Sequence, residues 1–280
     1  MTEILRTIPE MRARATAWRR EGLSLGLVPT MGFLHAGHRS LIDLARAEND
    51  RVVVSIFINP LQFGPGEDLA AYPRDLARDR ELCSAAGAEA VFLPSASDMY
   101  PPEAHTLVNV TELTETLCGA SRPGHFQGVL TVVTKLFNII QPDRAYFGRK
   151  DAQQLAAIDR LTRDLNMPVA VVPCPLVREP DGLALSSRNV YLSPEERRAA
   201  LVLSRSLDHG RKRLAAGETQ AGRVLAEMRA MIEEEPLVRL DYLEIVDAET
   251  MRPVTDIDRP VLVALAALVG RARLIDNFSY

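Results

Sequence analysis

The segment Arg51–Ile58 restricts the fold more than any other part of the chain. After the arginine it reads Val-Val-Val-Ser-Ile-Phe-Ile, a run that is nearly all apolar and largely β-branched. Such a run is typical of a strand buried on both faces of a parallel sheet. Further strands are predicted at 23–28, 90–93, 144–147 and 169–172, with helical segments between them, and a short edge strand is predicted at 106–110. This alternation predicts an α/β fold with a doubly wound parallel (Rossmann-like) sheet and right-handed crossovers.

The alternation of strands and helices ends after Pro175, where we place a domain boundary. Ser193 and Pro194 form a strong helix start, because serine is a good N-cap and proline suits the first helical position. Two helices are predicted at 194–216 and 218–234, and three strands at 241–246, 261–268 and 273–276. The sequence therefore predicts a Rossmann-like domain at 1–175 and a second, smaller α+β C-terminal domain at 176–280.

Charge and cysteine content narrow the class of protein. The 280 residues include 33 Lys and Arg against 37 Asp and Glu, a net charge of −4, which argues against a nucleic-acid partner. The three cysteines, Cys83, Cys118 and Cys174, fit neither a zinc spacing nor a disulfide framework. We expect buried thiols in a reducing cytoplasm. Neither a signal peptide nor a membrane-spanning run is visible, so no membrane association is expected.

A turn with two glycines and two histidines follows the first predicted strand. It reads Pro29-Thr30-Met31-Gly32-Phe33-Leu34-His35-Ala36-Gly37-His38, and a helix is predicted to begin near Gly37. Unpaired N–H groups at the start of a helix favour anions, and glycine lets a phosphate approach closely. Because His35 and His38 are three residues apart, a helical turn would bring both to one side. The turn indicates phosphate chemistry, with an ordinary tight turn as the alternative.

Polar segments also follow two other predicted strands, at 59–64 and 148–151. The carboxyl ends of parallel strands lie at one edge of a sheet, where ligands bind in this class of fold. The sequence has no P-loop, no Gly-x-Gly-x-x-Gly and no Gly-x-Ser-x-Gly. What remains is a cationic set that suits the charge developing on phosphorus: His35, His38, Lys150 and Arg188.

Several other residues are open to two interpretations. Gln62 and Gln154 could hydrogen-bond a small polar substrate or simply be solvated. Asn59 could bind substrate or cap its loop, and His125 could bind substrate or pack beneath its helix. Asp79 could hold a metal ion or belong to a solvated helix face.

Motifs along nearly the whole chain resemble those of the pantoate–β-alanine ligase (pantothenate synthetase) family, within the H-x-G-H nucleotidyltransferase-like superfamily. The matching segments are 29–38, 54–64, 72–74, 125–133, 147–154, 181–189, 241–244 and 276–277. The resemblance implies an ATP-dependent ligase that joins (R)-pantoate to β-alanine through a pantoyl-adenylate, giving pantothenate, AMP and pyrophosphate. It also implies Mg²⁺, a cytoplasmic homodimer and a C-terminal domain that acts as a lid.

The resemblance further implies a role for individual residues. It assigns ATP to Met31, Gly32, Phe33, Leu34, His35, Ala36, Gly37, His38, Gly148, Arg149, Lys150, Asp151, Val177, Leu185, Ser186, Ser187 and Arg188. Pantoate would bind between Gln62 and Gln154, with Asn59 and His125 nearby, and Asp79 is the candidate metal residue. His35, His38, Lys150 and Arg188 would be catalytic, with His38 as the proton donor.

One position departs from the family pattern, because Arg149 stands where the family usually has glutamate. This change leaves a nucleotide-binding regulatory module as an alternative from another class, although both histidines, Lys150 and Arg188 argue for catalysis. Another H-x-G-H adenylyltransferase, which transfers AMP to a phosphate, is the nearest enzymatic alternative. An aminoacyl-tRNA synthetase is disfavoured by the acidic balance.

Overall fold

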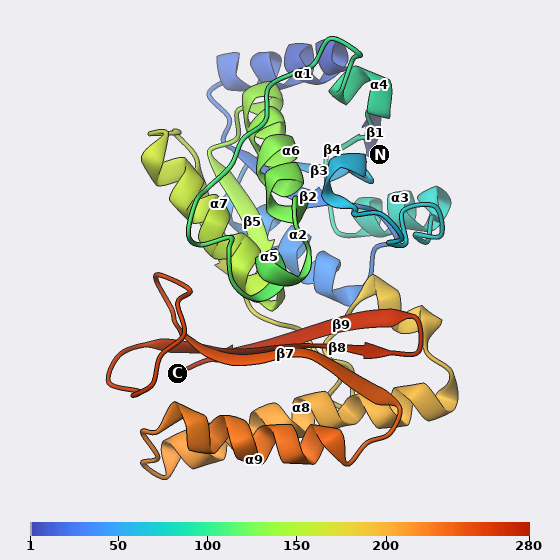
Figure 1. Ribbon diagram of the computed structural model, residues 1–280. Helices are drawn as coiled ribbons and strands as arrows, with labels where there is room; N and C mark the ends of the chain where they lie inside the picture. Colours follow the sequence, from blue (N-terminus) through green and yellow to red (C-terminus); the bar gives the residue numbers. More distant parts are fainter. Residues whose placement is uncertain (1) are drawn as a thin grey trace. The chain divides into compact units, whose positions relative to one another are not determined.

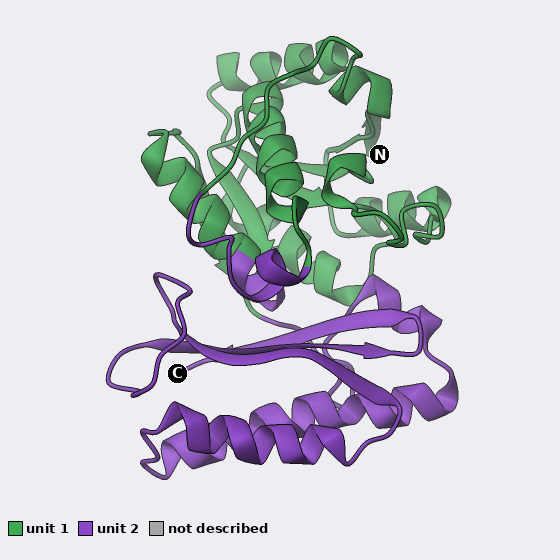
Figure 2. Cartoon of the chain, in the orientation of Figure 1, with its two compact units in different colours: residues 1–110, 122–149, 154–175 green, residues 111–121, 150–153, 176–280 purple. Residues whose placement is uncertain are grey.

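The computed structural model describes residues 2–280, which form two compact units (Figures 1 and 2). Unit 1 comprises residues 1–110, 122–149 and 154–175, and unit 2 comprises 111–121, 150–153 and 176–280. The chain thus passes between units at 175/176, where the sequence places its domain boundary. Two short segments, 111–121 and 150–153, are grouped with unit 2 although they precede that boundary. The division at 175 and the lid role stay predictions.

The first part of the chain alternates strands and helices, as predicted. Its elements are β1 (Glu3–Leu5), α1 (Ile8–Arg20), β2 (Leu25–Thr30), α2 (Ala36–Glu48), β3 (Arg51–Ile56), η1 (Pro60–Gln62), α3 (Leu76–Ala85), β4 (Ala90–Phe92), α4 (Ala96–Met99), α5 (Leu117–Ser121), α6 (His125–Ile140), β5 (Arg144–Gly148), η2 (Arg149–Asp151), α7 (Ala152–Asp164) and β6 (Ala170–Cys174). Six strands form one parallel sheet in the order β1-β4-β3-β2-β5-β6. The predicted doubly wound sheet is confirmed.

The two faces of this sheet bury alternate residues of its strands. Leu27 and Val53 point into a core that α1, α6 and α7 cover, whereas Val28 and Val54 point into a second core beneath α2 and α3. Successive strand side chains face opposite sides, so a strand covered on both faces must be apolar throughout. This explains the uninterrupted apolar run that begins after Arg51.

Strands β2 and β5 lie at the switch point of the sheet. Their pairing covers Gly26 with Arg144 and Leu27 with Ala145 and then stops, although β2 continues to Thr30 beside β3, and β5 to Gly148 beside β6. In doubly wound sheets ligands bind beyond the strand ends at such a point. The histidine turn leaves β2 here.

Unit 2 contains the remaining elements: η3 (Ser187–Tyr191), α8 (Pro194–Ala215), α9 (Ala221–Glu233), β7 (Val238–Asp247), β8 (Val261–Val269) and β9 (Ala272–Ser279). The last three form an antiparallel sheet in the order β7-β8-β9. Helices α8 and α9 pack on one face of it around a separate apolar core that includes Leu203, Met228 and Leu265 (Figure 1). The predicted smaller α+β part is confirmed.

One local prediction needs correction, and one edge strand was not predicted. Residues 106–110 do not form a strand, and the sheet ends instead in β1, a three-residue strand paired with β4. Val108 donates its N–H to the Thr131 hydroxyl of α6 (3.0 Å), so this segment uses its polar groups away from the sheet. A strand as short as β1 has too few residues to show a period in the sequence.

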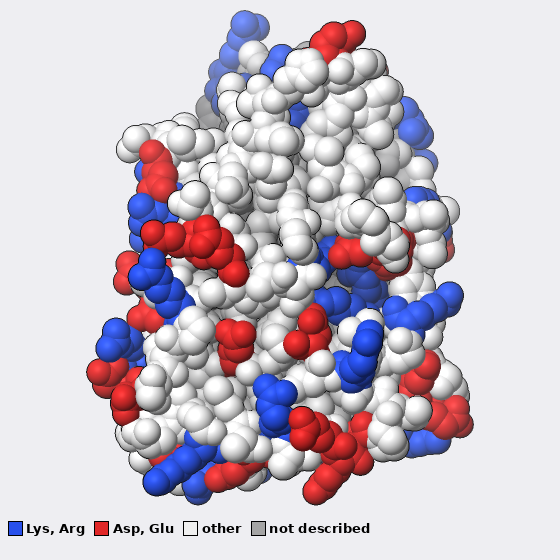
Figure 3. All heavy atoms as spheres, viewed as in Figure 1, with Lys and Arg blue, Asp and Glu red and all other residues white. Residues whose placement is uncertain are grey.

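The cysteines agree with the expectation of buried thiols. Cys83, Cys118 and Cys174 are all free and buried, and burial raises the pKa of Cys83 to about 12. Across residues 2–280, no helix is both long and apolar enough to cross a membrane. On the face drawn in Figure 3, acidic and basic side chains are interspersed.

Candidate active site

The turn between β2 and α2 depends on a left-handed backbone and on one buried carboxylate. Gly32 and Phe33 have φ angles of 84° and 50°. A Cβ on Gly32 would lie 3.0 Å from Ile56 Cγ2 and 3.1 Å from Asp79 Oδ2, so only glycine suits this position. The next two N–H groups donate to Asp79: Phe33 to Oδ2 (2.8 Å) and Leu34 to Oδ1 (2.6 Å).

Asp79 therefore acts as a buried anchor for the turn. Its exposed fraction is 2%, and burial raises its pKa more than the two backbone N–H groups lower it. From the sequence, Asp79 is expected either to hold a metal ion or to lie on a solvated helix face. Neither interpretation includes this anchoring function. Asp79 lies in α3, about 45 residues from the turn, and a single sequence shows no sign of that contact.

Backbone N–H groups also fix the state of both histidine rings. The Gly37 N–H donates to His35 Nδ1 (3.1 Å), and the His35 N–H donates to His38 Nδ1 (3.3 Å). A ring nitrogen that accepts a hydrogen bond carries no proton, so in each neutral ring the proton lies on Nε2. The ring centroids are 4.0 Å apart. The first turn of α2 thus offers two Nε2–H donors in addition to its own backbone N–H groups.

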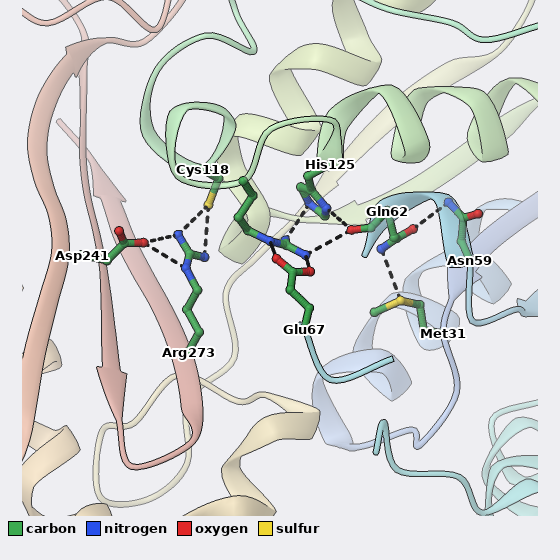
Figure 4. A network of polar contacts seen from close by, with 9 residues as sticks. Met31, Asn59, Gln62, Glu67, Cys118, His125, Asp241 and Arg273 are labelled. Carbon is green, nitrogen blue, oxygen red and sulfur yellow. Dashed lines mark hydrogen bonds and ion pairs between the residues drawn. The ribbon is translucent and has the colours of Figure 1, made fainter. Parts of the chain in front are cut away.

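Gln62 ends the 3₁₀ turn η1 after β3, and its amide orientation follows from its neighbours (Figure 4). Asn59 Nδ2 donates to the Gly128 carbonyl (3.0 Å) and to Gln62 Oε1 (3.1 Å). Because a carbonyl can only accept, the nitrogen of Asn59 must be on that side. Gln62 Nε2 is then the outer atom, 3.3 Å from Met31 Sδ, a weak acceptor. Gln62 presents an N–H donor.

Asn59 is itself almost fully used within the protein. It is 1% exposed, and its Oδ1 accepts from the Tyr100 hydroxyl (2.8 Å). Of the two interpretations that the sequence leaves open, this bonding supports the structural one: Asn59 caps η1 and orients Gln62. Direct substrate binding by Asn59 stays a prediction.

The two adjacent glutamines of α7 differ sharply. Gln153, 6% exposed, donates to the Leu113 and Thr116 carbonyls (2.9 and 2.8 Å) and accepts from the Cys118 N–H (3.0 Å). Its amide holds the 113–118 segment within unit 2. Gln154 is half-buried and belongs to unit 1. The amide of Gln153 is thus occupied by main-chain contacts, and substrate binding by Gln154 stays a prediction.

In unit 2, Lys150 is held through its main chain. Asn277 Nδ2 donates to its carbonyl (2.8 Å), and its ammonium lies 3.7 Å from the Asp151 carboxylate. Arg149, the position that departs from the family pattern, is exposed and belongs to unit 1.

The segment 177–189 of unit 2 is a loop fixed by main-chain and side-chain hydrogen bonds. The Leu185 N–H donates to the Val177 carbonyl (3.0 Å), and the Arg188 N–H donates to Ser186 Oγ (3.2 Å). Asn189 Nδ2 donates to Glu179 Oε1 (2.7 Å), and Arg197 pairs with the same carboxylate (2.6 Å). The predicted nucleotide residues of this segment therefore lie on a rigidly bonded loop.

Another motif segment of unit 2 makes a structural cluster (Figure 4). Asp241 forms an ion pair with Arg273 (2.6 Å), and the Arg273 guanidinium lies 3.6 Å from Cys118 Sγ. The Tyr242 hydroxyl is 3.2 Å from the same sulfur. These contacts attach α5 to the sheet of unit 2.

Comparison with known proteins decides the family. The family model described as pantoate-beta-alanine ligase matches residues 3–279. The chain belongs to the pantoate–β-alanine ligase family. Membership confirms the predicted enzyme class, a ligase of pantothenate biosynthesis that uses ATP.

Curated relatives and solved structures agree with this assignment. Pantothenate synthetases of Moorella thermoacetica and Ruminiclostridium cellulolyticum are 58% and 56% identical to the chain, each alignment covering 98% of the chain and 97% of the relative. The crystal structure of pantothenate synthetase from Thermus thermophilus matches with a TM-score of 0.94 at 50% identity, covering 99% of both chains. A pantoate-beta-alanine ligase from Francisella tularensis, complexed with beta-gamma ATP and beta-alanine, matches with a TM-score of 0.81 at 32% identity, covering 99% of this chain and 97% of that one.

A ligase of this family handles nucleotide phosphates, so the fit of Mg²⁺ to the chain matters. Residues 2–280 contain no group of three or more His, Cys, Asp or Glu side chains that could hold a metal ion. Both oxygens of Asp79 accept backbone N–H groups, but each keeps a second lone pair. The absence of such a metal-binding group from the described residues fits an ion held mainly by phosphate oxygens and water, with one or two carboxylates from the protein.

Proposed function

We propose that this ligase activates (R)-pantoate as a pantoyl-adenylate and then transfers the pantoyl group to β-alanine. In the first step a pantoate carboxylate oxygen attacks the α-phosphorus of ATP, and the bond to pyrophosphate breaks. In the second, the β-alanine amine attacks the acyl carbon, AMP leaves, and the amine loses a proton. Family membership supports the overall reaction, and the histidine turn is the observation that supports the adenylate route.

We assign the histidine turn to the phosphates of ATP. The first turn of α2 supplies backbone N–H groups and the positive end of its dipole. His35 and His38, each with Nδ1 accepting a backbone N–H, would donate from Nε2 to oxygens on which negative charge develops. His38 would deliver its proton toward the leaving pyrophosphate.

Pantoate is assigned to Gln62 and Gln154. The orientation of Gln62, set by Asn59, supports binding of a substrate oxygen by its Nε2–H. From unit 2, Lys150 and Arg188 are assigned to the phosphate charge, and Met31, Val177 and Leu185 to the nucleotide. Mg²⁺ would neutralise phosphate charge when bound, with Asp79 as the candidate protein ligand.

Isotope exchange tests the adenylate route. Purified protein with ATP, Mg²⁺ and (R)-pantoate should exchange labelled pyrophosphate into ATP without β-alanine. If protein that still makes pantothenate shows no exchange, an adenylate does not form reversibly in the absence of β-alanine, which contradicts the proposed route. A His38→Ala variant should retain its fold by circular dichroism and lose the exchange; exchange at the parental rate would refute the role of His38.

The remaining properties belong to the same proposal. The family resemblance supports a homodimer, which light scattering on a sizing column would detect. Buried, unlinked thiols support action in the reducing cytoplasm. The net charge of −4 supports a protein without a nucleic-acid partner.

A further inference from the structure

A partly buried ion pair next to Gln62 belongs to none of the roles assigned above. Arg122 Nε and Nη2 donate to the two oxygens of Glu67 (2.7 and 2.6 Å) in a bidentate pair. The side chains are only 15% and 26% exposed. Burial alone would raise the pKa of Glu67, but the hydrogen bonds and charge of Arg122 outweigh it and hold that pKa below its usual value. The pair is therefore a charged, geometrically fixed unit.

The same guanidinium reaches two further groups. Arg122 Nη2 donates to the Gln62 carbonyl (3.2 Å), and Nη1 lies 3.0 Å from His125 Nε2. Arginine can only donate, so this ring nitrogen accepts and the neutral ring carries its proton on Nδ1. His125 Nδ1 is 2.8 Å from the Gln62 carbonyl and donates to it (Figure 4). Two donors thus converge on one main-chain oxygen.

The main chain of η1 is also fixed by close packing against α6. A Cβ on Gly128 of α6 would lie 2.4 Å from the carbonyl carbon of Leu61 and 2.6 Å from the N of Gln62. The helix backbone therefore touches η1 directly. Asn59 then holds the side-chain amide of Gln62. The peptide, its carbonyl and its side chain are each restrained by a different contact.

We propose that Arg122, supported by Glu67 and together with His125, is a positioning residue for Gln62. The proposal rests on the proposed role of Gln62 in binding pantoate. A glutamine side chain has several rotatable bonds, and fixing its backbone removes part of the conformational entropy lost when substrate binds. Glu67 keeps the guanidinium in the plane that reaches both the carbonyl and His125. None of these three side chains needs to touch substrate.

The test is the pantoate dependence of pyrophosphate exchange in Arg122→Gln, Gln62→Ala and the double variant. Arg122→Gln should raise the half-saturating pantoate concentration on the order of tenfold, with that of ATP changed less than about twofold. On the Gln62→Ala background, the same substitution should have no further effect on pantoate, because residues that act through one group are not additive.

A matched control separates positioning from stability. Arg46 and Glu89 form another partly buried ion pair in unit 1 (3.0 Å). This pair shares no residue with the contacts that hold Gln62. Arg46→Gln should lower the unfolding midpoint in urea without changing the pantoate dependence. If Arg122→Gln does not fold, Glu67→Gln and Arg122→Lys take its place, since each keeps a polar side chain but loses the fixed fork.

The outcomes are distinct. An unchanged pantoate dependence in Gln62→Ala would overturn both the assignment of Gln62 and this inference. A large effect in Gln62→Ala with none in the Arg122 and Glu67 variants would overturn the inference alone. A full additional loss in the double variant would mean that Arg122 binds substrate directly, which also contradicts a positioning role.

Discussion

At the scale of single residues, Asp79 sets the shape of the histidine turn. Its two oxygens accept hydrogen bonds from the consecutive N–H groups of Phe33 and Leu34. The positive φ angles of Gly32 and Phe33, 84° and 50°, turn both N–H groups to the same side. His35 follows directly as the N-cap of α2. The positions of His35 and His38 therefore depend on the hydrogen bonds that Asp79 accepts from the two residues before His35.

Asp79→Asn is expected to impair the first half-reaction. The amide can accept only one of the two N–H groups, and its NH₂ would face the other, which costs about 1–3 kcal/mol. We expect pyrophosphate exchange to fall at least tenfold through misplacement of the histidines, in protein that is still folded. Asp75→Asn is the control, because asparagine also caps the start of α3 well. Exchange at the parental rate in Asp79→Asn would contradict the anchoring role.

Gly128→Ala is expected to displace η1. The new methyl group would overlap main-chain atoms of Leu61, which have no rotamer to change, so we expect a loss of about 1–3 kcal/mol in unfolding free energy. The half-saturating pantoate concentration should rise as well. Gly222→Ala in α9 is the control, since nothing lies within 4 Å of its Cβ position. It should leave the pantoate dependence unchanged and slightly raise stability.

At the scale of elements, most strands and helices could be predicted from the sequence, because the signals that mark them are local. The apolar run after Arg51 and the helix start at Ser193-Pro194 each depend on neighbours in the chain. Strand β2 ends two residues later than predicted, at Thr30, because pairing with Ile56 of β3 extends it. Pairing across the sheet is a tertiary fact that the segment alone does not show.

The candidate site was predictable only in part, for the same reason. Motif segments identify His35, His38 and Gln62 directly. The residues that hold them, Asp79, Arg122 and Gly128, act across 45 to 69 positions of sequence. Gly128 lies within the motif segment 125–133, but neither that motif nor the residue types of Asp79 and Arg122 show which distant group each one holds.

The ion pair between the loop after η1 and the segment before α6 makes stability depend on pH. Because the pKa of Glu67 is below 4.5 in the folded protein, its stabilisation is present above the unfolded pKa and is lost as pH falls through the folded pKa. At neutral pH the free energy of unfolding of wild type should exceed that of Glu67→Gln by about 1 kcal/mol, a value suited to a partly exposed pair. Urea unfolding at pH 7 and pH 4 should show the difference shrinking, and a constant difference would contradict it.

At the scale of the whole molecule, each unit has its own apolar core. The cores of unit 1 include Met11, Trp18 and Ile42, and that of unit 2 includes Leu203 and Leu265. Two separate cores allow two separate unfolding transitions, and in that case each unit has its own free energy of unfolding.

Trp18 makes this testable, because it is the single tryptophan and lies in unit 1. Leu265→Ala should destabilise unit 2 by about 2–5 kcal/mol. When urea unfolding of this variant is followed by circular dichroism, we expect the part of the signal that comes from unit 2 to be lost at a lower urea concentration. The transition in Trp18 fluorescence should stay where it is. An equal shift in both signals would show that the units unfold together.

The histidine at the start of α2 has a consequence for engineering. Asn, Asp, Ser and Thr are the favoured N-caps, and His35 occupies that position with its Nδ1 in place of a side-chain oxygen. His35→Asn should keep the bond from the Gly37 N–H, raise the melting temperature and remove the Nε2–H to which we assign a catalytic role. Selection for heat resistance alone would therefore favour an inactive enzyme at this position, and a thermostability screen of this ligase must score turnover alongside melting.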